Sequence, residues 1–249
     1  MWVRLDEDER PELKDPVLLV SLSTSIQQYK VLYSHGRELG KFMLKKMDFK
    51  KFATLYSSSM PPLVMISDDG LIRLSSASFY RYSGERDIVL LAGDASPVED
   101  QYEFSDAVLR YASGLGIREV VSVGTRWTEE AGSPSASLKV KGFATDEKGV
   151  KELEALGVEI VRDEPAPFFA SLIVALAGRY GVRGYKLSID HGEPSPHPRS
   201  LIEILAILQK MIGFKVETGD LDKVASKMAA NLELVAGSES PQRKNGIYG

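Results

Sequence analysis

The sequence predicts an α/β fold, in which a mostly parallel sheet is flanked by helices on both faces. Short apolar segments that are typical of buried strands alternate along the chain with longer segments whose apolar residues recur at helical spacing. Glycine follows several of the helical segments, as is common at helix C-termini. Parallel strands need crossover connections, which helices supply, so this alternation favours a sheet covered on both sides.

The first half of the chain contains two predicted strands, one helix and a hairpin. Val17-Leu18-Leu19-Val20-Ser21-Leu22 is a short apolar run after a proline and predicts a buried strand. Apolar residues at helical spacing between Tyr29 and Met47 predict the helix that follows, and Phe52 to Ser57 is interpreted as the second strand. Met65 to Leu74 is typical of a β-hairpin, because Asp69-Gly70 supplies the positive φ that tight turns need.

The second half of the chain continues the same alternation. Asp87 to Ala92 contains the apolar run Ile88-Val89-Leu90-Leu91 and predicts another buried strand. After it we predict strands at residues 119–123, 138–144, 158–161 and 184–189, and helices at residues 101–115, 146–156, 168–180, 198–212 and 220–235. No linker divides the chain before Gly237. We therefore expect an acidic N-terminal arm at residues 1–14, a single α/β domain at residues 15–236 and a flexible tail at residues 237–249.

Composition and charge exclude several classes of protein. The chain has 249 residues, of which 43% are hydrophobic and 27% charged, as is ordinary for a globular protein. Its formal net charge of −4 does not prepare the surface for nucleic acid. The absence of cysteine excludes thiol catalysis, zinc-thiolate sites and disulfides. Without a signal peptide or an apolar run of the roughly 20 residues that span a bilayer, we expect a cytoplasmic protein that binds neither nucleic acid nor membrane.

The last three residues, Ile247-Tyr248-Gly249, are the most distinctive segment of the sequence. They follow residues 237–246, which have no apolar periodicity and cannot bury enough surface to offset their ordering entropy. Tyr248 offers a large rigid apolar surface with a hydroxyl, Ile247 a second apolar group, and the terminal carboxylate an ionic group. This ending resembles the hydrophobic-tyrosine-any motif with which proteasome activators and some assembly chaperones enter pockets between the α-subunits of the proteasome core.

Five further segments, taken in order and spacing, resemble the proteasome assembly chaperone 2 family, which has archaeal and bacterial members. They are Met60–Leu74, Asp87–Pro97, Gly114–Gly124, Gly142–Asp146 and Pro196–Ser200. The resemblance covers roughly residues 15–235 and implies a scaffold that holds proteasome α-subunits and forms homo-oligomers. It also implies a fold similar to that of purine nucleoside phosphorylases. One segment departs from the family: Ser21–Gln28 stands where members commonly have a glycine-rich turn, so a nucleotide or phosphate role at that turn has no support.

Two groups of residues follow predicted strands, where open α/β sheets bind ligands. Gly124-Thr125-Arg126 is the first, and Arg126 is suited to pair with a phosphate. His191-Gly192-Glu193 with His197 is the second, but its spacing fixes no metal geometry, and we predict neither a metal nor a cofactor. The sequence has no Gly-x-Ser-x-Gly elbow and no Walker loop, which argues against a serine hydrolase and an ATP-driven activity.

The leading interpretation is a non-catalytic, ATP-independent proteasome assembly chaperone or proteasome-binding scaffold that engages α-subunits through Ile247-Tyr248-Gly249. Two alternatives stay open: an enzyme on a phosphorylase-like fold that acts on a small ligand, and an activator or adaptor of the mature proteasome. We also expect a homo-oligomer, because the predicted helices at 168–180 and 201–212 hold more apolar surface than one covering face requires.

Overall fold

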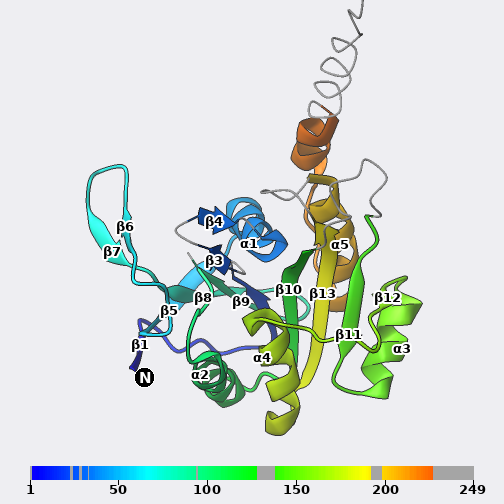
Figure 1. Cartoon of the computed structure of the whole chain (residues 1–249), viewed down its shortest axis with the longest axis horizontal. Helices are drawn as coiled ribbons and strands as arrows, with labels where there is room; N and C mark the ends of the chain where they lie inside the picture. Colours follow the sequence, from blue (N-terminus) through cyan, green and yellow to red (C-terminus); the bar gives the residue numbers. More distant parts are fainter. Residues whose placement is uncertain are drawn as a thin grey trace, which may run out of the picture.

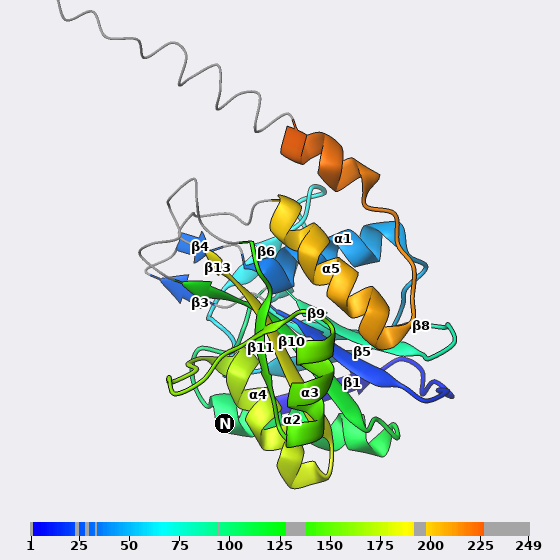
Figure 2. The same cartoon turned by 90° about the vertical axis from the view of Figure 1, so that its right-hand side faces the viewer.

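The computed structural model describes residues 2–22, 25–27, 30–32, 34–93, 95–127, 138–191 and 198–226, and every structural statement below concerns these residues. Within them a single large sheet carries helices on both of its faces (Figures 1 and 2). Its strands are β1 Val3–Glu7, β2 Val17–Ser21, β5 Lys50–Ser57, β8 Ala77–Tyr82, β9 Ile88–Gly93, β10 Glu119–Trp127, β11 Lys141–Ala144, β12 Glu159–Ile160 and β13 Arg183–His191.

Two small hairpins and several helices complete the described part of the chain. The hairpins pair β3 Ser25–Gln27 with β4 Lys30–Leu32, and β6 Val64–Ile66 with β7 Ile72–Leu74. The helices are α1 His35–Lys46, α2 Gln101–Gly114, α3 Glu147–Ala155, α4 Phe169–Ala177 with the 3-10 turn η2 Gly178–Tyr180, and α5 Pro198–Ile212. Residues 219–226 are also helical.

The parallel part of the sheet is its centre. The strand order is β1-β5-β8-β9-β2-β10-β13-β11-β12, and the neighbours β9, β2, β10 and β13 all run parallel. On one side β8, β5 and β1 continue the sheet with antiparallel pairings, and on the other β11 joins β13 antiparallel before β12 pairs parallel to β11. The predicted α/β fold with helices on both faces is therefore confirmed, although the outer strands make the sheet mixed.

The helices divide the core into two layers. Side chains of α1 and α5 pack on one face of the sheet, and those of α2 and α4 pack on the other. Strand β2 contributes to both layers, because Val17 and Leu19 point to the first face while Leu18 and Val20 point to the second. Burial on both faces is the physical reason for the unbroken apolar run that predicts this strand.

Several boundaries differ from the predicted ones, and two of these differences have clear local reasons. Helix α1 begins at His35, later than the predicted start near Tyr29, because Ser34 caps it by accepting a hydrogen bond from the backbone N–H of Arg37 at 3.1 Å. Strand β10 extends beyond Val123 to Trp127, because β13 continues beside it over its whole length. The polar ends of β10 and β13 thus belong to the sheet rather than to loops.

Strands β1, β3, β4 and β8 are not among the predicted elements, because none of them contains a long continuous apolar run. Strand β4 lies at residues that were predicted to begin the first helix, so that part of the prediction is wrong. Strand β1 lies in the segment set apart as an acidic arm, yet it pairs with β5 in the register Val3↔Ser57 to Glu7↔Ala53. The edge of the sheet therefore falls within residues 1–14. No helix of the described residues is long and apolar enough to cross a membrane.

Candidate functional site

A cavity of about 350 Å³ opens at the carboxyl ends of β10 and β13. Thr125 and Arg126, two residues of the predicted ligand pocket, line it. Apolar walls come from β11 and from the segment that leads into α4, with Phe143, Val161, Pro165, Ala166, Pro167 and Phe168, and polar side chains come from Glu164, Ser171, Lys186 and Ser188. The cavity lies at the end of the parallel strands where open α/β sheets bind ligands.

The second group of predicted pocket residues is described only in part. His191 is the last residue of β13 and pairs in register with Trp127. Gly192, Glu193 and His197 lie outside the described residues. Among the residues that are described, no group of three or more His, Cys, Asp or Glu side chains is placed to hold a metal ion.

Lys186 is the functional candidate that the sequence reasoning missed. It lies within β13, lines the cavity and is only 5% exposed. Its Nζ donates a hydrogen bond to the carbonyl oxygen of Leu187 at 2.9 Å, and none of the ion pairs between described residues involves it. Burial lowers the pKa of Lys186 to about 7, because the charged form is removed from water without a compensating anion. The available sequence signal was a lysine inside an otherwise buried central strand, where lysine is rare.

Gly124 makes room for this lysine across the strand pair. A Cβ atom at position 124 would lie 2.6 Å from the Nζ atom of Lys186 and 3.4 Å from the Cβ atom of Ala170. Any larger residue would push the ammonium group away from its place. Gly124, Lys186 and α4 therefore form one packed unit beneath the cavity.

Arg126 stands at the rim of the cavity and is engaged by carboxylates. It forms an ion pair with Glu164, and its Nε atom lies 3.1 Å from Oδ1 of Asp190. Asp190 also accepts a hydrogen bond from Nζ of Lys141 at 2.7 Å. The hydrogen bond to Glu164 raises the pKa of Arg126, with burial opposing it and the charge of Asp190 adding to it. Carboxylates of the chain itself thus engage the arginine that is suited to pair with a phosphate.

His35 occupies the opposite face of β10. Its Nδ1 atom lies 2.9 Å from Oγ1 of Thr125, and its Nε2 atom lies 2.8 Å from Oγ of Ser200. The imidazole is fully buried and connects the first residue of α1 to β10 and α5. These contacts give His35 a structural role on the face away from the cavity.

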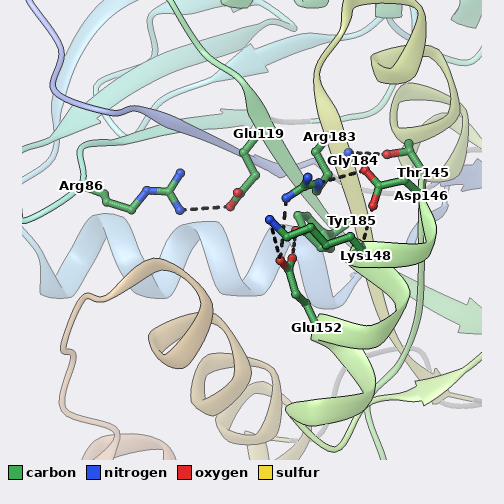
Figure 3. A network of polar contacts seen from close by, with 10 residues as sticks. Arg86, Glu119, Thr145, Asp146, Lys148, Glu152, Arg183, Gly184 and Tyr185 are labelled. Carbon is green, nitrogen blue, oxygen red and sulfur yellow. Dashed lines mark hydrogen bonds and ion pairs between the residues drawn. The ribbon is translucent and has the colours of Figure 1, made fainter.

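A network of charged residues connects the other end of the same strands to α3 (Figure 3). Arg183, the first residue of β13, places Nε 3.0 Å from Oδ2 of Asp146 and Nη1 3.8 Å from Oε1 of Glu152. Tyr185 donates its hydroxyl hydrogen to Glu152. Because these groups satisfy one another and lie at the amino ends of the strands, we assign the network to stability.

Asp146 is expected to stabilise α3 in a pH-dependent way. It caps the helix by accepting the backbone N–H of Gly149 at 2.7 Å, and this bond, followed by that to Arg183, lowers the pKa of its carboxyl group. Because the pKa of Asp146 is lower in the folded than in the unfolded state, its ionised carboxylate stabilises the fold at pH values above the unfolded-state pKa of about 3.9. This stabilisation is lost as the pH falls through the folded-state pKa. Urea denaturation should show Asp146→Asn to be less stable than the parent at pH 7, with a difference that narrows below about pH 4. A difference that does not change with pH would contradict this account.

The hairpin of β6 and β7 extends away from the sheet (Figure 1). It carries an exposed apolar face. Val64 pairs in register with Leu74, and Ile66 with Ile72, so all four side chains lie on one side of the hairpin. Their exposed fractions are 54%, 55%, 70% and 71% in the order Val64, Leu74, Ile66, Ile72. We name these four residues the hairpin face. A contiguous apolar surface of this kind marks an interaction site in a protein that folds correctly.

The predicted apolar helices do not provide such a surface. On α4, Ile173, Val174 and Ala177 are buried against the sheet, and on α5 Ile204 and Leu208 are buried in the same way. The expectation that these helices carry surplus apolar surface is therefore wrong, because the chain's own two core layers use it. Among the described residues, four of the exposed large apolar side chains lie together on the hairpin face instead.

Comparison with known proteins places the chain among relatives of the same fold. The Methanocaldococcus jannaschii protein MJ1210 is 22% identical over 213 residues, which are 84% of this chain and 81% of that protein. Pyrococcus furiosus PbaB, an archaeal proteasome activator, matches in structure with a TM-score of 0.79 and 20% identity over 94% of this chain and 98% of its own. The monoclinic crystal form of Pyrococcus furiosus PbaA, an archaeal homolog of proteasome-assembly chaperone, matches with a TM-score of 0.72 and 22% identity. This match covers 95% of this chain and 92% of PbaA. The model of the PAC2 family matches residues 36–236, and the chain belongs to this family.

Proposed function

We propose that this protein is an ATP-independent, non-catalytic scaffold that acts in the cytoplasm and binds proteasome α-subunits through Ile247-Tyr248-Gly249. The observation that carries the proposal is the coincidence of a PAC2 body over residues 36–236 with a hydrophobic-tyrosine-any ending on the same chain. The similarity to PbaA and PbaB supports a proteasome-related role, since both are described in connection with the proteasome. The tail residues lie outside the described part of the chain.

The scaffold acts by presenting several tails from one homo-oligomer. A single tail binds weakly, because ordering about a dozen residues costs free energy. Several tails on one body make later contacts intramolecular and raise the overall affinity by about 10²–10⁴. Residues 237–249 span up to about 40 Å when extended at roughly 3.3 Å per residue. That reach tolerates a mismatch between the symmetry of the scaffold and that of the α-subunit ring.

The hairpin face is the surface that we assign to self-association, with a second copy of this chain as its occupant. The four aliphatic side chains carry no charge or hydrogen-bonding group, so they complement another apolar surface. A second copy supplies an identical surface at the same concentration, and an isologous contact of two hairpin faces closes without further growth.

A pull-down separates the proposed roles. Free α-subunits and assembled core particles are each offered to the full chain and to a chain that ends at Asn245. An assembly chaperone retains free α-subunits, an activator or adaptor retains the assembled core, and in both cases the shortened chain retains neither. Equal capture by the full and shortened chains would place the binding surface on the folded body and overturn the tail proposal.

The cavity at the carboxyl ends of β10 and β13 is the observation that favours the alternative, an enzyme that acts on a small ligand. An enzyme of the nucleoside-phosphorylase kind would convert nucleosides in a saturable manner, and the rate would fall in Arg126→Ala. We expect no turnover, because Glu164 and Asp190 already engage the guanidinium group. Saturable turnover by the purified parent protein would overturn the scaffold proposal.

A further inference from the structure

We propose that the cavity at the carboxyl ends of β10 and β13 binds a small organic carboxylate, whose charge is held by Lys186. None of the residues that line this cavity belongs to the tail or to the hairpin face, so the site neither requires the proposed scaffold role nor follows from it. It does not require catalysis either.

Lys186 carries unused hydrogen-bonding capacity. A protonated lysine has three N–H donors, and the contact with the carbonyl oxygen of Leu187 uses one of them. The side chain is 5% exposed and belongs to no ion pair between described residues. A buried ammonium without an anion is costly, and burying an anion beside it compensates that cost. The cavity that Lys186 lines is the place where such an anion fits.

The N-terminus of α4 provides a second favourable feature at the same cavity. Phe168, which immediately precedes α4, and Ser171 in its first turn both line the cavity. The N-cap residue Phe168 makes no side-chain hydrogen bond to the helix, so α4 begins without a side-chain cap. The positive end of a helix favours a negative group there, and backbone N–H groups serve as its donors.

The backbone at Phe168 is also strained. Its φ of 75° and ψ of 161° lie in a region that essentially only glycine adopts freely. Such strain persists only where the surrounding structure holds it, and it is concentrated at binding sites. Here the strained residue is Phe168, which is 46% exposed and lines the cavity.

Size and lining define the rest of the ligand. A volume of about 350 Å³ lies near the lower end of the roughly 300–1,000 Å³ found for small-molecule sites. Phe143, Val161, Pro165 and Pro167 form apolar walls, which suit a compact aromatic or aliphatic body. The ligand is therefore a small molecule with one charged end and one apolar end.

The charges around the cavity favour a single negative charge on the ligand. Arg126 pairs with Glu164 and Asp190, and Lys141 pairs with Asp190, so these groups neutralise one another. Helix α4, which also packs against Lys186, contains no charged residue. One ammonium group remains to balance the ligand, so the second charge of a dianion would have no partner in the cavity. A carboxylate is thus preferred over a phosphate.

Benzoate is a suitable probe, with benzyl alcohol as its uncharged counterpart. Isothermal titration calorimetry should show that benzoate binds and benzyl alcohol does not. Because the pKa of free Lys186 is about 7, binding above that pH takes up a proton. The affinity should fall by up to about tenfold for each pH unit above 7, and the measured heat should depend on the ionisation heat of the buffer. Binding that is unaffected by pH between 6 and 8.5, or absent at millimolar benzoate, would overturn the proposal.

Two substitutions test the role of the lysine itself. Lys186→Met keeps the length of the side chain and removes the charge, and it should abolish benzoate binding while the circular dichroism spectrum stays unchanged. Gly124→Ala should weaken binding, since its Cβ atom would meet Nζ of Lys186 at 2.6 Å. Lys210→Met, at an exposed position of α5, is the matched control and should bind as the parent does. Equal binding by Lys186→Met and the parent would contradict the assignment. If Lys186→Met does not fold, the pH dependence of benzoate binding by the parent protein tests the role of Lys186 instead.

Discussion

Replacing Tyr248 with alanine is expected to weaken binding to proteasome α-subunits by about 2 kcal/mol or more, which corresponds to roughly 30-fold. Aromatic anchors that fill closed pockets dominate interfaces, because they bury a large rigid surface and still satisfy a hydroxyl group. Titration of the α-subunits with the parent and the variant measures the effect. Unchanged binding by Tyr248→Ala would show that the tail does not form the contact.

Two further variants, on either side of Tyr248, test which parts of the tail contribute to binding. Ile247→Ala should weaken binding less than Tyr248→Ala, since fewer buried carbon atoms are lost. One residue added after Gly249 should also weaken binding, because it moves the carboxylate away from its partner. Thermal melts of all variants provide the control, and melting temperatures equal to that of the parent are required before a loss of binding is assigned to the tail.

Charged residues on the hairpin face are expected to dissociate the homo-oligomer that we propose. Full burial of each isoleucine contributes about 1.5–3 kcal/mol, so the double variant Ile66→Lys/Ile72→Glu removes about 3–6 kcal/mol per copy from the contact. Residues 66 and 72 lie opposite each other in the hairpin. The introduced lysine and glutamate can therefore form an ion pair that keeps the hairpin folded. Light scattering should report an oligomer for the parent and 27.4 kDa for the variant.

The opposite side of the same hairpin supplies the matched control. Met65 and Arg73 form the intervening pair and point away from the hairpin face. Met65→Lys/Arg73→Glu should therefore keep the mass of the parent. A parent that is monomeric at micromolar concentration, or a hairpin-face variant that stays assembled, would contradict self-association through this surface.

The central strands were predictable from sequence, whereas an outer strand was not. Val17 to Ser21 is buried at every position, so its apolar run is enough to predict a buried strand. In β8, Ala77 and Phe79 are buried while Ser78 is only partly so, and this weak alternation does not stand out from a loop. Antiparallel pairing with β5 and β9, which no local pattern records, decides its conformation.

Two of the predicted pocket residues line the cavity, but the residues that they contact could not be predicted from the sequence. Gly124 to Arg126 follows a buried strand, and that position led to the cavity region. The partners of Arg126, Glu164 and Asp190, are 38 and 64 residues away in the chain and could not be deduced from spacing. The hairpin turn was likewise visible in Asp69-Gly70, but alternating apolar residues usually indicate a buried face, so its exposure could not be anticipated.

The two edges of the sheet bear on how copies of the chain can meet. Strand β12 at one edge has only two residues, and β1 at the other carries Arg4 and Asp6, whose side chains lie 2.6 Å apart. Short edges and charged edges resist main-chain pairing between copies. The contact between copies that we propose at the hairpin face then depends on aliphatic side chains, whose association weakens on cooling. An assembly of this kind loosens in the cold, so its mass should be measured at the temperature at which it works.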